Sequence, residues 1–165
     1  MSVRVNAAEM ADVEAITALW VDLVTDQQQF GTHLAGRENR AAARSVVEQY
    51  VHADGVAVAR RTDSDGGVLG FVMFHVEHGM YQQDARRGIV ENVYVVPAAR
   101  GDGIGSRLLE YAEDALAADG ADVIALSVLA DNERAQALYR NRGYRPHRIP
   151  MEKRVGADTS SNDPA

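Results

Sequence analysis

The sequence contains no cysteine, and this absence removes several kinds of chemistry at once. A disulfide framework, a thiolate metal site and a cysteine nucleophile each require a thiol, so all three are excluded. Any catalytic chemistry must come from oxygen and nitrogen groups.

The sequence also lacks a long apolar run. No stretch approaches the ~18 apolar residues of a membrane-spanning helix. Residues 1–6 show no charged region followed by an apolar stretch, which is the pattern of a secretory leader. We therefore expect no membrane partner and a cytoplasmic location.

Positive charge is scarce. The chain has 17 Lys and Arg against 24 Asp and Glu, which gives a formal net charge of −7. Nucleic-acid binding depends on Lys and Arg that neutralise phosphates, so we expect no nucleic-acid partner. An acidic protein mildly favours cationic substrates.

Length and composition predict one globular domain. The chain has 165 residues, of which 46 % are hydrophobic and 25 % charged, as in ordinary globular proteins. We expect one domain over residues 1–155. The last residues, 156–165, are small and polar without periodicity, so we expect a flexible tail there.

Hydropathy periodicity predicts an alternation of strands and helices. A short strand around Val3 and Val5 is followed by Asn6, a candidate helix cap. The expected elements are helices near 13–24 and 38–52, a hairpin of strands 56–60 and 68–76, a strand at 88–96, a helix at 103–118, a buried strand at 122–128, a helix from 131 or 132 to 142, and a closing strand at 144–155. This order predicts an α/β (α+β) fold with helices packed on a mixed sheet.

The most informative segment is a strand, a glycine-rich turn and a helix start over residues 93–106. The turn reads Arg100-Gly101-Asp102-Gly103-Ile104-Gly105-Ser106. Glycines allow successive backbone N–H groups to converge on an anion, and the helix that follows adds the positive end of its dipole. Arg100 would add a full positive charge. We therefore expect a phosphate-binding loop.

Two other glycine-rich loops fit the spacing poorly. A nucleotide P-loop requires Gly-Lys-Ser/Thr, and this turn has no lysine. A dinucleotide-binding fingerprint requires Gly or Ala where Ser106 stands, and an acidic residue that ends the next strand. Asp122 instead begins that strand. A dinucleotide-binding domain is therefore a weak alternative.

The pattern Arg-x-x-Gly-x-Gly from Arg100 to Gly105 resembles a signature of the GNAT N-acetyltransferase superfamily. A second segment, Asn132 to Tyr139 followed by Gly143-Tyr144, looks like the family's other signature. The order of elements extends the resemblance over residues 3–153. It implies an acyl-CoA N-acyltransferase fold with a mixed, mostly antiparallel central sheet flanked by helices.

The resemblance also implies where the acyl donor binds. Acetyl-CoA would lie with its pyrophosphate on the loop from Arg100 through Gly101, Asp102, Gly103, Ile104 and Gly105 to Ser106. Its pantetheine would pair like an added strand with the backbone of Val93, Tyr94 and Val95. Asn132 would contact the coenzyme or an active-site water, and it could equally cap the helix that follows.

Transfer to an amine requires a deprotonated amine and a proton for the departing thiolate. Tyr139 occupies the position where the family often has the general acid, although a core aromatic would also fit there. Glu91 is a candidate base acting through water, or only an anchor for a cationic substrate. A regular strand would place Glu91, Val93 and Val95 on one face.

Other features leave the acceptor open. Two imidazoles, His75 and His78, make at most half of a metal site, so we expect no metal. Candidate walls of the acceptor site are Trp20, Asp26, Phe30 and Tyr81, with core packing favoured for Trp20. The acceptor could be a small-molecule amine or a peptide amine. A homodimer is favoured, and an acyl-CoA-binding module without transfer activity is the main alternative.

Overall fold

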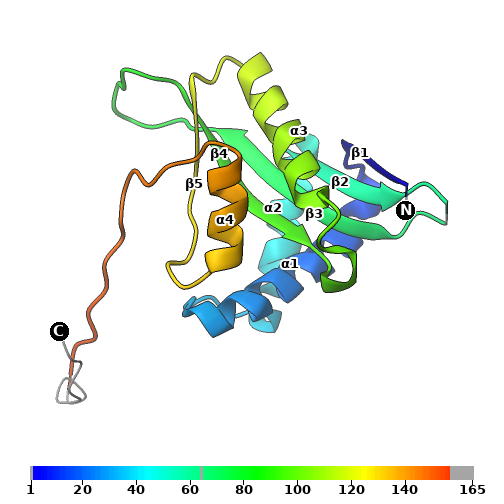
Figure 1. The fold of residues 1–165 in the computed structure, drawn as a ribbon, viewed down its shortest axis with the longest axis horizontal. Helices are drawn as coiled ribbons and strands as arrows, with labels where there is room; N and C mark the ends of the chain where they lie inside the picture. Colours follow the sequence, from blue (N-terminus) through cyan, green and yellow to red (C-terminus); the bar gives the residue numbers. More distant parts are fainter. Residues whose placement is uncertain (1, 64, 157–165) are drawn as a thin grey trace.

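The computed structural model describes residues 2–63 and 65–156, which form one sheet with helices on both of its faces (Figure 1). The predicted flexible tail at residues 156–165 lies outside the described residues, except for Gly156. The strands are β1 (Val3–Ala7), β2 (Val56–Arg61), β3 (Val68–Val76), β4 (Arg87–Val95) and β5 (Val123–Leu126). The α-helices are α1 (Val13–Gln27), α2 (Arg40–His52), α3 (Ile104–Ala118) and α4 (Glu133–Asn141), and the 3₁₀ turns are η1 (Met10–Asp12), η2 (Gln28–Phe30), η3 (Arg37–Asn39) and η4 (Pro97–Ala99).

The sheet is mixed and mostly antiparallel. Its strands lie in the order β1-β2-β3-β4-β5. The first three neighbouring pairs are antiparallel, and β5 pairs with β4 in parallel. This arrangement confirms the expected fold class.

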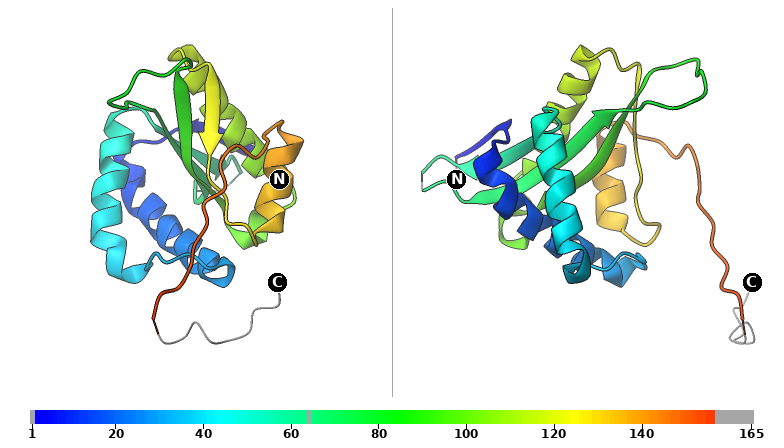
Figure 2. Two further views of the ribbon diagram at one scale, coloured as in Figure 1. Left: turned by 90° about the vertical axis from the view of Figure 1, so that its left-hand side faces the viewer. Right: turned by 180° about the vertical axis from the view of Figure 1, so that it is seen from behind.

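The helices form two layers around the sheet. Helices α1 and α2 cover one face, and α3 and α4 lie on the other (Figure 2). The side chains of β3 alternate between these layers, as the period of two in a strand requires. Phe71 and Met73 belong to the core cluster that contains the α1 and α2 side chains, whereas Val72 and Phe74 belong to the cluster beneath α3.

The prediction that Asn6 caps the first helix is wrong. Asn6 lies inside β1, where it pairs with Val58, because the strand continues to Ala7. The helical segment begins after Glu9, whose N–H donates to the Asp12 carboxylate at 2.8 Å, while the Asp12 N–H donates to the Glu9 carbonyl at 2.9 Å. Two orphan N–H groups are satisfied together in this way.

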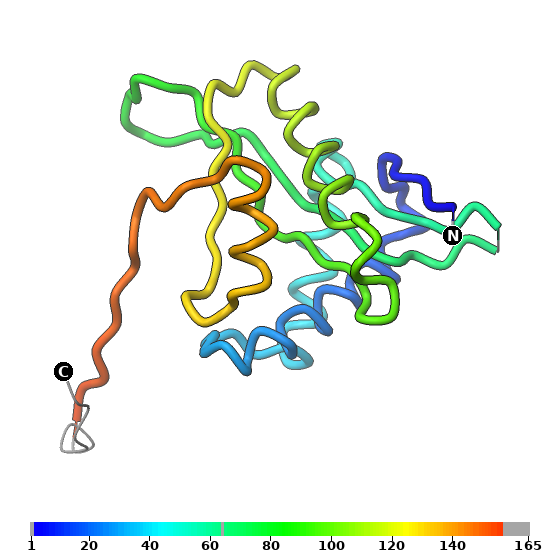
Figure 3. The backbone as a smooth tube through the Cα atoms, in the orientation of Figure 1, coloured from blue at the N-terminus to red at the C-terminus, as the bar shows by residue number. Residues whose placement is uncertain are grey.

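The prediction of a closing strand at 144–155 is also wrong. Residues 144–155 pair with no strand of the described chain and leave the body as an extended segment (Figure 3). As a consequence, β5 is an edge strand, and the predicted buried strand at 122–128 is shorter and partly exposed. Hydrophobicity alone did not distinguish an edge strand from a central one.

None of the helices in the described residues is both long enough and apolar enough to span a membrane.

Candidate functional site

The pairing between β4 and β5 ends at a β-bulge in β4. Strand β3 pairs Phe74 with Val90 and Met73 with Asn92, which leaves Glu91 as the extra residue. Strand β5 pairs with β4 only as far as Val90, opposite Leu126. Beyond the bulge the two parallel strands separate. The backbone of Val93 and Val95 that points away from β3 consequently has no β5 partner.

The turn after β4 presents its backbone to solvent. Gly101 and Gly103 adopt left-handed φ angles of 93° and 78°, and a Cβ at either would meet no heavy atom within 4 Å. The N–H groups of residues 101–103 have no acceptor in the part of the chain that the structure describes. Helix α3 begins at Ile104, and the first N–H groups of an α-helix have no intrahelical partner. The N–H groups of residues 101–106 therefore form a ready cradle for an anion.

Arg100 is tied to the base of this loop. Its Nε donates to the carbonyl of Val95 at 2.8 Å, and its Nη2 lies 3.2 Å from the Asp26 carboxylate at the end of α1. The guanidinium also stacks 5.4 Å from the centre of the Tyr94 ring. The charge of Arg100 is thus shared with Asp26, a pairing across 74 positions that the sequence did not reveal.

A cavity of about 450 Å³ joins the glycine-rich turn to the gap between β4 and β5. Elements far apart in sequence surround it: the end of α1, the β4–α3 turn, the segment after β5, and α4. The lining includes the predicted residues Val93, Tyr94, Val95, Arg100, Gly101, Gly103, Ile104, Gly105, Ser106, Asn132 and Tyr139. Asp102 and Glu91 are absent from the lining.

Tyr139 lies on α4 and faces this cavity. Its half-buried ring packs edge-on against Tyr144, with 6.0 Å between ring centres. Its hydroxyl makes no hydrogen bond within residues 2–63 and 65–156. Burial raises the pKa of Tyr139 above its usual value, so the phenol holds its proton at neutral pH and can donate it.

Helix α4 is held against the turn by two features. Asn132 accepts the N–H of Ala135 at 3.1 Å, which confirms it as the N-cap. Gly105 allows close approach, because a Cβ there would lie 3.4 Å from Leu138 Cδ2. The cap and the small residue together bring Tyr139 to the same cavity as the loop.

Glu91 does not share a face with Val93 and Val95, and that prediction is wrong. Val90 and Val93 both pack into the cluster beneath α3, which strict alternation would forbid. The bulge adds one residue and turns Glu91 toward the opposite face, where its carboxylate lies 3.5 Å from His75 Nδ1. A bulge has no reliable sequence signal.

His75 and Tyr50 are neighbours of Glu91 that sequence reasoning did not connect. The Tyr50 hydroxyl lies 3.1 Å from His75 Nδ1, so α2, β3 and β4 each contribute one group. The pKa of Tyr50 is raised by burial and by the Glu91 charge. The three residues lie far apart in sequence, so the sequence alone did not indicate that they form a cluster.

The remaining candidate residues fall into two groups, those that line the cavity and those that lie elsewhere. Asp26 and Phe30 line the cavity, whereas Trp20 packs against the cluster between α1, α2 and the sheet. Tyr81 is exposed on the β3–β4 loop. His78 lies on the same loop, and the described residues contain no group of three or more potential metal ligands.

Comparison with protein families gives one match, over residues 16–144, to the sequence model described as the acetyltransferase (GNAT) family. A mycothiol acetyltransferase from Beutenbergia cavernae is 37 % identical over 84 residues, which is 51 % of this chain and 26 % of that protein. The chain spans 26–37 % of the length of the three mycothiol acetyltransferases that it matches.

Some matches extend over most of the chain. An aminoalkylphosphonate N-acetyltransferase from Salmonella typhimurium is 26 % identical over 146 residues, covering 88 % of this chain and 87 % of that protein. Among solved structures, a putative acetyl transferase from Pyrococcus furiosus superposes with a TM-score of 0.71 at 25 % identity. It covers 93 % of this chain and 100 % of its own.

Proposed function

The chain belongs to the acetyltransferase (GNAT) family, and from this premise we propose that it transfers an acetyl group from acetyl-CoA directly to a primary amine. The observation that carries the proposal is a single cavity lined both by residues of the glycine-rich turn and by Tyr139. An anion cradle beside a proton donor is the arrangement that such a transfer requires.

The residues present fit the coenzyme. Residues 101–106 would hold the pyrophosphate through backbone N–H groups, and the backbone of Val93 with the N–H of Val95 would pair with the pantetheine, because the Val95 carbonyl already accepts from Arg100. Asn132 lines the same cavity. Arg100 contributes by bracing the turn through Val95 and Asp26, and Asp102 contributes its backbone.

Acetyl-CoA would supply the acetyl group as an activated thioester. The amine nitrogen would form a bond to the carbonyl carbon, the carbon–sulfur bond would break, and Tyr139 would donate its proton to the departing sulfur. The proton that the nitrogen loses on becoming an amide would restore the phenol of Tyr139 through solvent. The attacking ammonium must first lose a proton. Glu91 would accept that proton through water or attract the cation, and the net charge of −7 favours a cationic acceptor.

The proposal extends to substrate class and location. The matched relatives named for mycothiol and aminoalkylphosphonate acetylation support a small-molecule amine, and a peptide amine is the second option. A cytoplasmic location belongs to the same proposal. No observation favours a coenzyme-binding module without transfer activity.

Release of free thiol from acetyl-CoA tests the proposal, measured with polyamines, aminoglycosides, amino acids and short peptides. We expect turnover with one acceptor class, and a fall in kcat of about 10²-fold in Tyr139→Phe with CoA affinity unchanged. Tyr111→Phe is the matched control, because Tyr111 is a half-buried tyrosine of α3 outside the cavity.

Glu91→Gln in the same assay separates its two roles. A base changes the pH profile of kcat, whereas an anchor raises KM for cationic acceptors only. CoA binding without thiol release for any acceptor would instead favour the coenzyme-binding module.

A further inference from the structure

Three polar side chains from different elements meet on the face of the sheet that α1 and α2 cover. His75 lies on β3, Glu91 is the bulged residue of β4, and Tyr50 lies in the last turn of α2. The Nδ1 atom of His75 lies 3.1 Å from the Tyr50 hydroxyl and 3.5 Å from the Glu91 carboxylate. One ring nitrogen is therefore shared between a phenol and a carboxylate.

Main-chain contacts hold Tyr50 against β3. The Gly55 N–H donates to the Tyr50 carbonyl at 2.8 Å, and the Phe74 N–H donates to the Gly55 carbonyl at 2.9 Å. A Cβ at Gly55 would lie 2.4 Å from the Phe74 carbonyl oxygen, so no side chain fits there. The Tyr50 ring meets the His75 ring edge-on, with 5.8 Å between ring centres. The backbone thus fixes the place of the Tyr50 hydroxyl beside the imidazole.

The two distances indicate which tautomer His75 adopts. Burial and the charge of Glu91 raise the pKa of Tyr50, so its hydroxyl keeps its proton and can donate it. An N–H that donates to a carboxylate brings the two atoms to about 2.7–3.2 Å, and the separation from Glu91 is longer than this. The Nδ1 lone pair therefore accepts from Tyr50, and the ring proton of His75 lies on Nε2.

The opposite side of the imidazole is open to solvent. The side chains of His75 and Glu91 are 37 % and 44 % exposed. Within the described residues, Nε2 of His75 has no hydrogen-bond partner. A proton on Nε2 can therefore pass directly to water.

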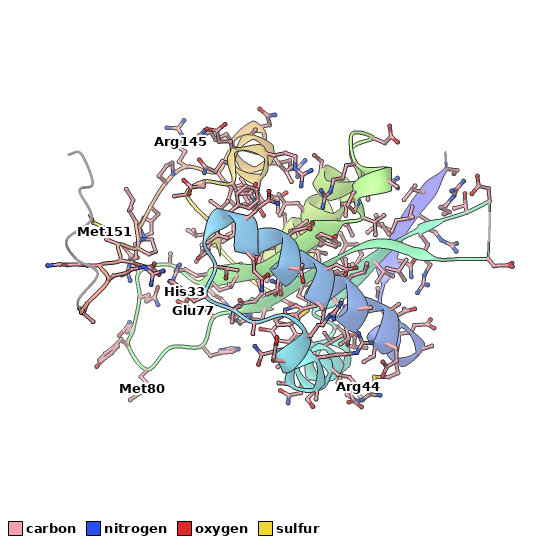
Figure 4. The ribbon with its side chains drawn as sticks, turned by 90° about the horizontal axis from the view of Figure 1, so that it is seen from below. His33, Arg44, Glu77, Met80, Arg145 and Met151 are labelled. Atoms are coloured by element: carbon pink, nitrogen blue, oxygen red, sulfur yellow. The ribbon has the colours of Figure 1, made fainter. Side chains whose placement is uncertain are left out.

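One further charged group acts on His75 from its own strand. Glu77 lies two positions along β3, at the base of the loop that carries Met80 (Figure 4). Its carboxylate is paired with Arg87 at 2.8 Å and accepts from Gln83 at 2.8 Å. Its charge is thus shared locally, whereas the Glu91 carboxylate has no cationic partner besides His75 in the described chain.

Basicity favours a role for the imidazole behind the carboxylate. A glutamate titrates near ~4.3, an imidazole near ~6.5 and a primary ammonium near ~10.4. An imidazole is therefore about two orders of magnitude closer in basicity to the acceptor amine than a carboxylate is. A proton that reaches Glu91 can move to the vacant lone pair on Nδ1, and the imidazolium that results is stabilised by the Glu91 carboxylate.

On the basis of the proposed acetyl transfer, we propose that His75 is the proton acceptor behind Glu91. The acceptor ammonium loses one proton through water to the Glu91 carboxylate, and Glu91 passes a proton to Nδ1 of His75. The imidazolium then releases its Nε2 proton to solvent, and exchange with water restores the tautomer that Tyr50 favours. One proton thus moves from the ammonium to solvent in each turnover, and the free amine attacks the thioester.

The pH dependence of kcat/KM for a primary amine tests this relay in the full chain. Thiol release is measured between about pH 6 and about pH 9.5 for the wild type, His75→Gln and His78→Gln. We expect His75→Gln to lower kcat/KM at least ~10-fold near neutral pH. The loss should shrink toward the alkaline end, where more of the amine is already deprotonated. His78→Gln is the matched control, because it removes an exposed imidazole from the β3–β4 loop and should follow the wild type.

Rescue by imidazole separates proton transfer from a structural role, because His75 acts through Glu91. Added imidazole should raise kcat/KM of His75→Ala near neutral pH and leave Glu91→Gln unchanged. Circular dichroism melting checks that each variant is folded. Equal kcat/KM values for His75→Gln and the wild type at every pH, or no rescue of folded His75→Ala, would overturn the relay and leave acetyl transfer intact.

The ring tautomer provides a readout that needs no turnover. Nitrogen-15 NMR of labelled histidine should place the His75 proton on Nε2 in the wild type, and Tyr50→Phe should increase the share on Nδ1. A proton on Nδ1 in the wild type overturns the relay. Absence of thiol release from the wild type with every acceptor is instead a failure of the proposed acetyl transfer, and the relay falls with it.

Discussion

The two halves of the sheet differ in how completely they are closed. In β2 and β3, consecutive residues such as 56–59 and 70–74 are buried beneath helices on both faces. Beyond the bulge, β4 and β5 separate, and no residue of β5 is fully buried. The closed half supplies stability, and the open half supplies unpaired backbone groups for binding. One extra residue in β4, Glu91, thus marks the boundary between the packed half of the sheet and the half with unpaired backbone.

The largest expected effect lies in the closed half. Phe71 is fully buried between α1, α2 and the sheet, so Phe71→Ala should lower the free energy of unfolding by ~3–5 kcal/mol. Val123→Ala in the open half should change it by less than ~0.5 kcal/mol. Urea unfolding measures both. Equal losses would contradict the division into a stabilising half and a binding half.

A smaller effect is expected when a left-handed glycine is replaced by alanine, and two such glycines distinguish the cost of backbone strain from a loss of ligand binding. Gly103 and Gly66 share a φ angle of 78°, and neither has a heavy atom near a built Cβ. Gly103→Ala and Gly66→Ala should each cost ~1–2 kcal/mol of stability, because a left-handed residue with a Cβ is strained.

Only Gly103→Ala should also weaken CoA binding, measured by titration calorimetry, since Gly66 lies in the β2–β3 turn. Unchanged CoA affinity in Gly103→Ala, or an equal loss in Gly66→Ala, would count against the anion cradle.

The smallest effect is a loss of stability at alkaline pH. The pKa of Tyr144 is raised by burial and by its hydrogen bond to Glu113. Above an unfolded pKa of ~10 the unfolded chain releases this proton while the native chain retains it, so stability falls as pH rises toward the folded pKa.

At pH 10.5 this loss should be about 0.8 kcal/mol relative to pH 8, and Tyr144→Phe should reduce it. Urea unfolding at the two pH values measures the difference. An identical loss in the variant would assign the alkaline sensitivity to other tyrosines.

Local patterns in the sequence predicted much of the fold and the glycine-rich turn before α3. The turn from Arg100 to Ser106 and the cap at Asn132 are local, so their residue types specify their conformations. The bulge at Glu91 was not predictable, because it results from how β3 and β4 match in register. The partner of Arg100 was not predictable either, since Asp26 is distant in the chain.

The C-terminal segment shows a different limit. The sequence predicted that residues 144–155 close the sheet. A strand prediction says what a segment can form, but it does not say whether an edge of the sheet accepts it. In the structure Tyr144 is held by Glu113, and the segment pairs with no strand of the described chain.

The donors of the anion cradle are main-chain N–H groups, and this has an evolutionary consequence. A point mutation within residues 101–106 changes a side chain but removes an N–H only when it introduces proline. Such a site tolerates substitution better than one built from side chains, except at Gly101 and Gly103, whose left-handed φ angles disfavour a Cβ. The groups of Glu91, His75 and Tyr50 have no such protection, because they belong to side chains and a substitution replaces the group itself.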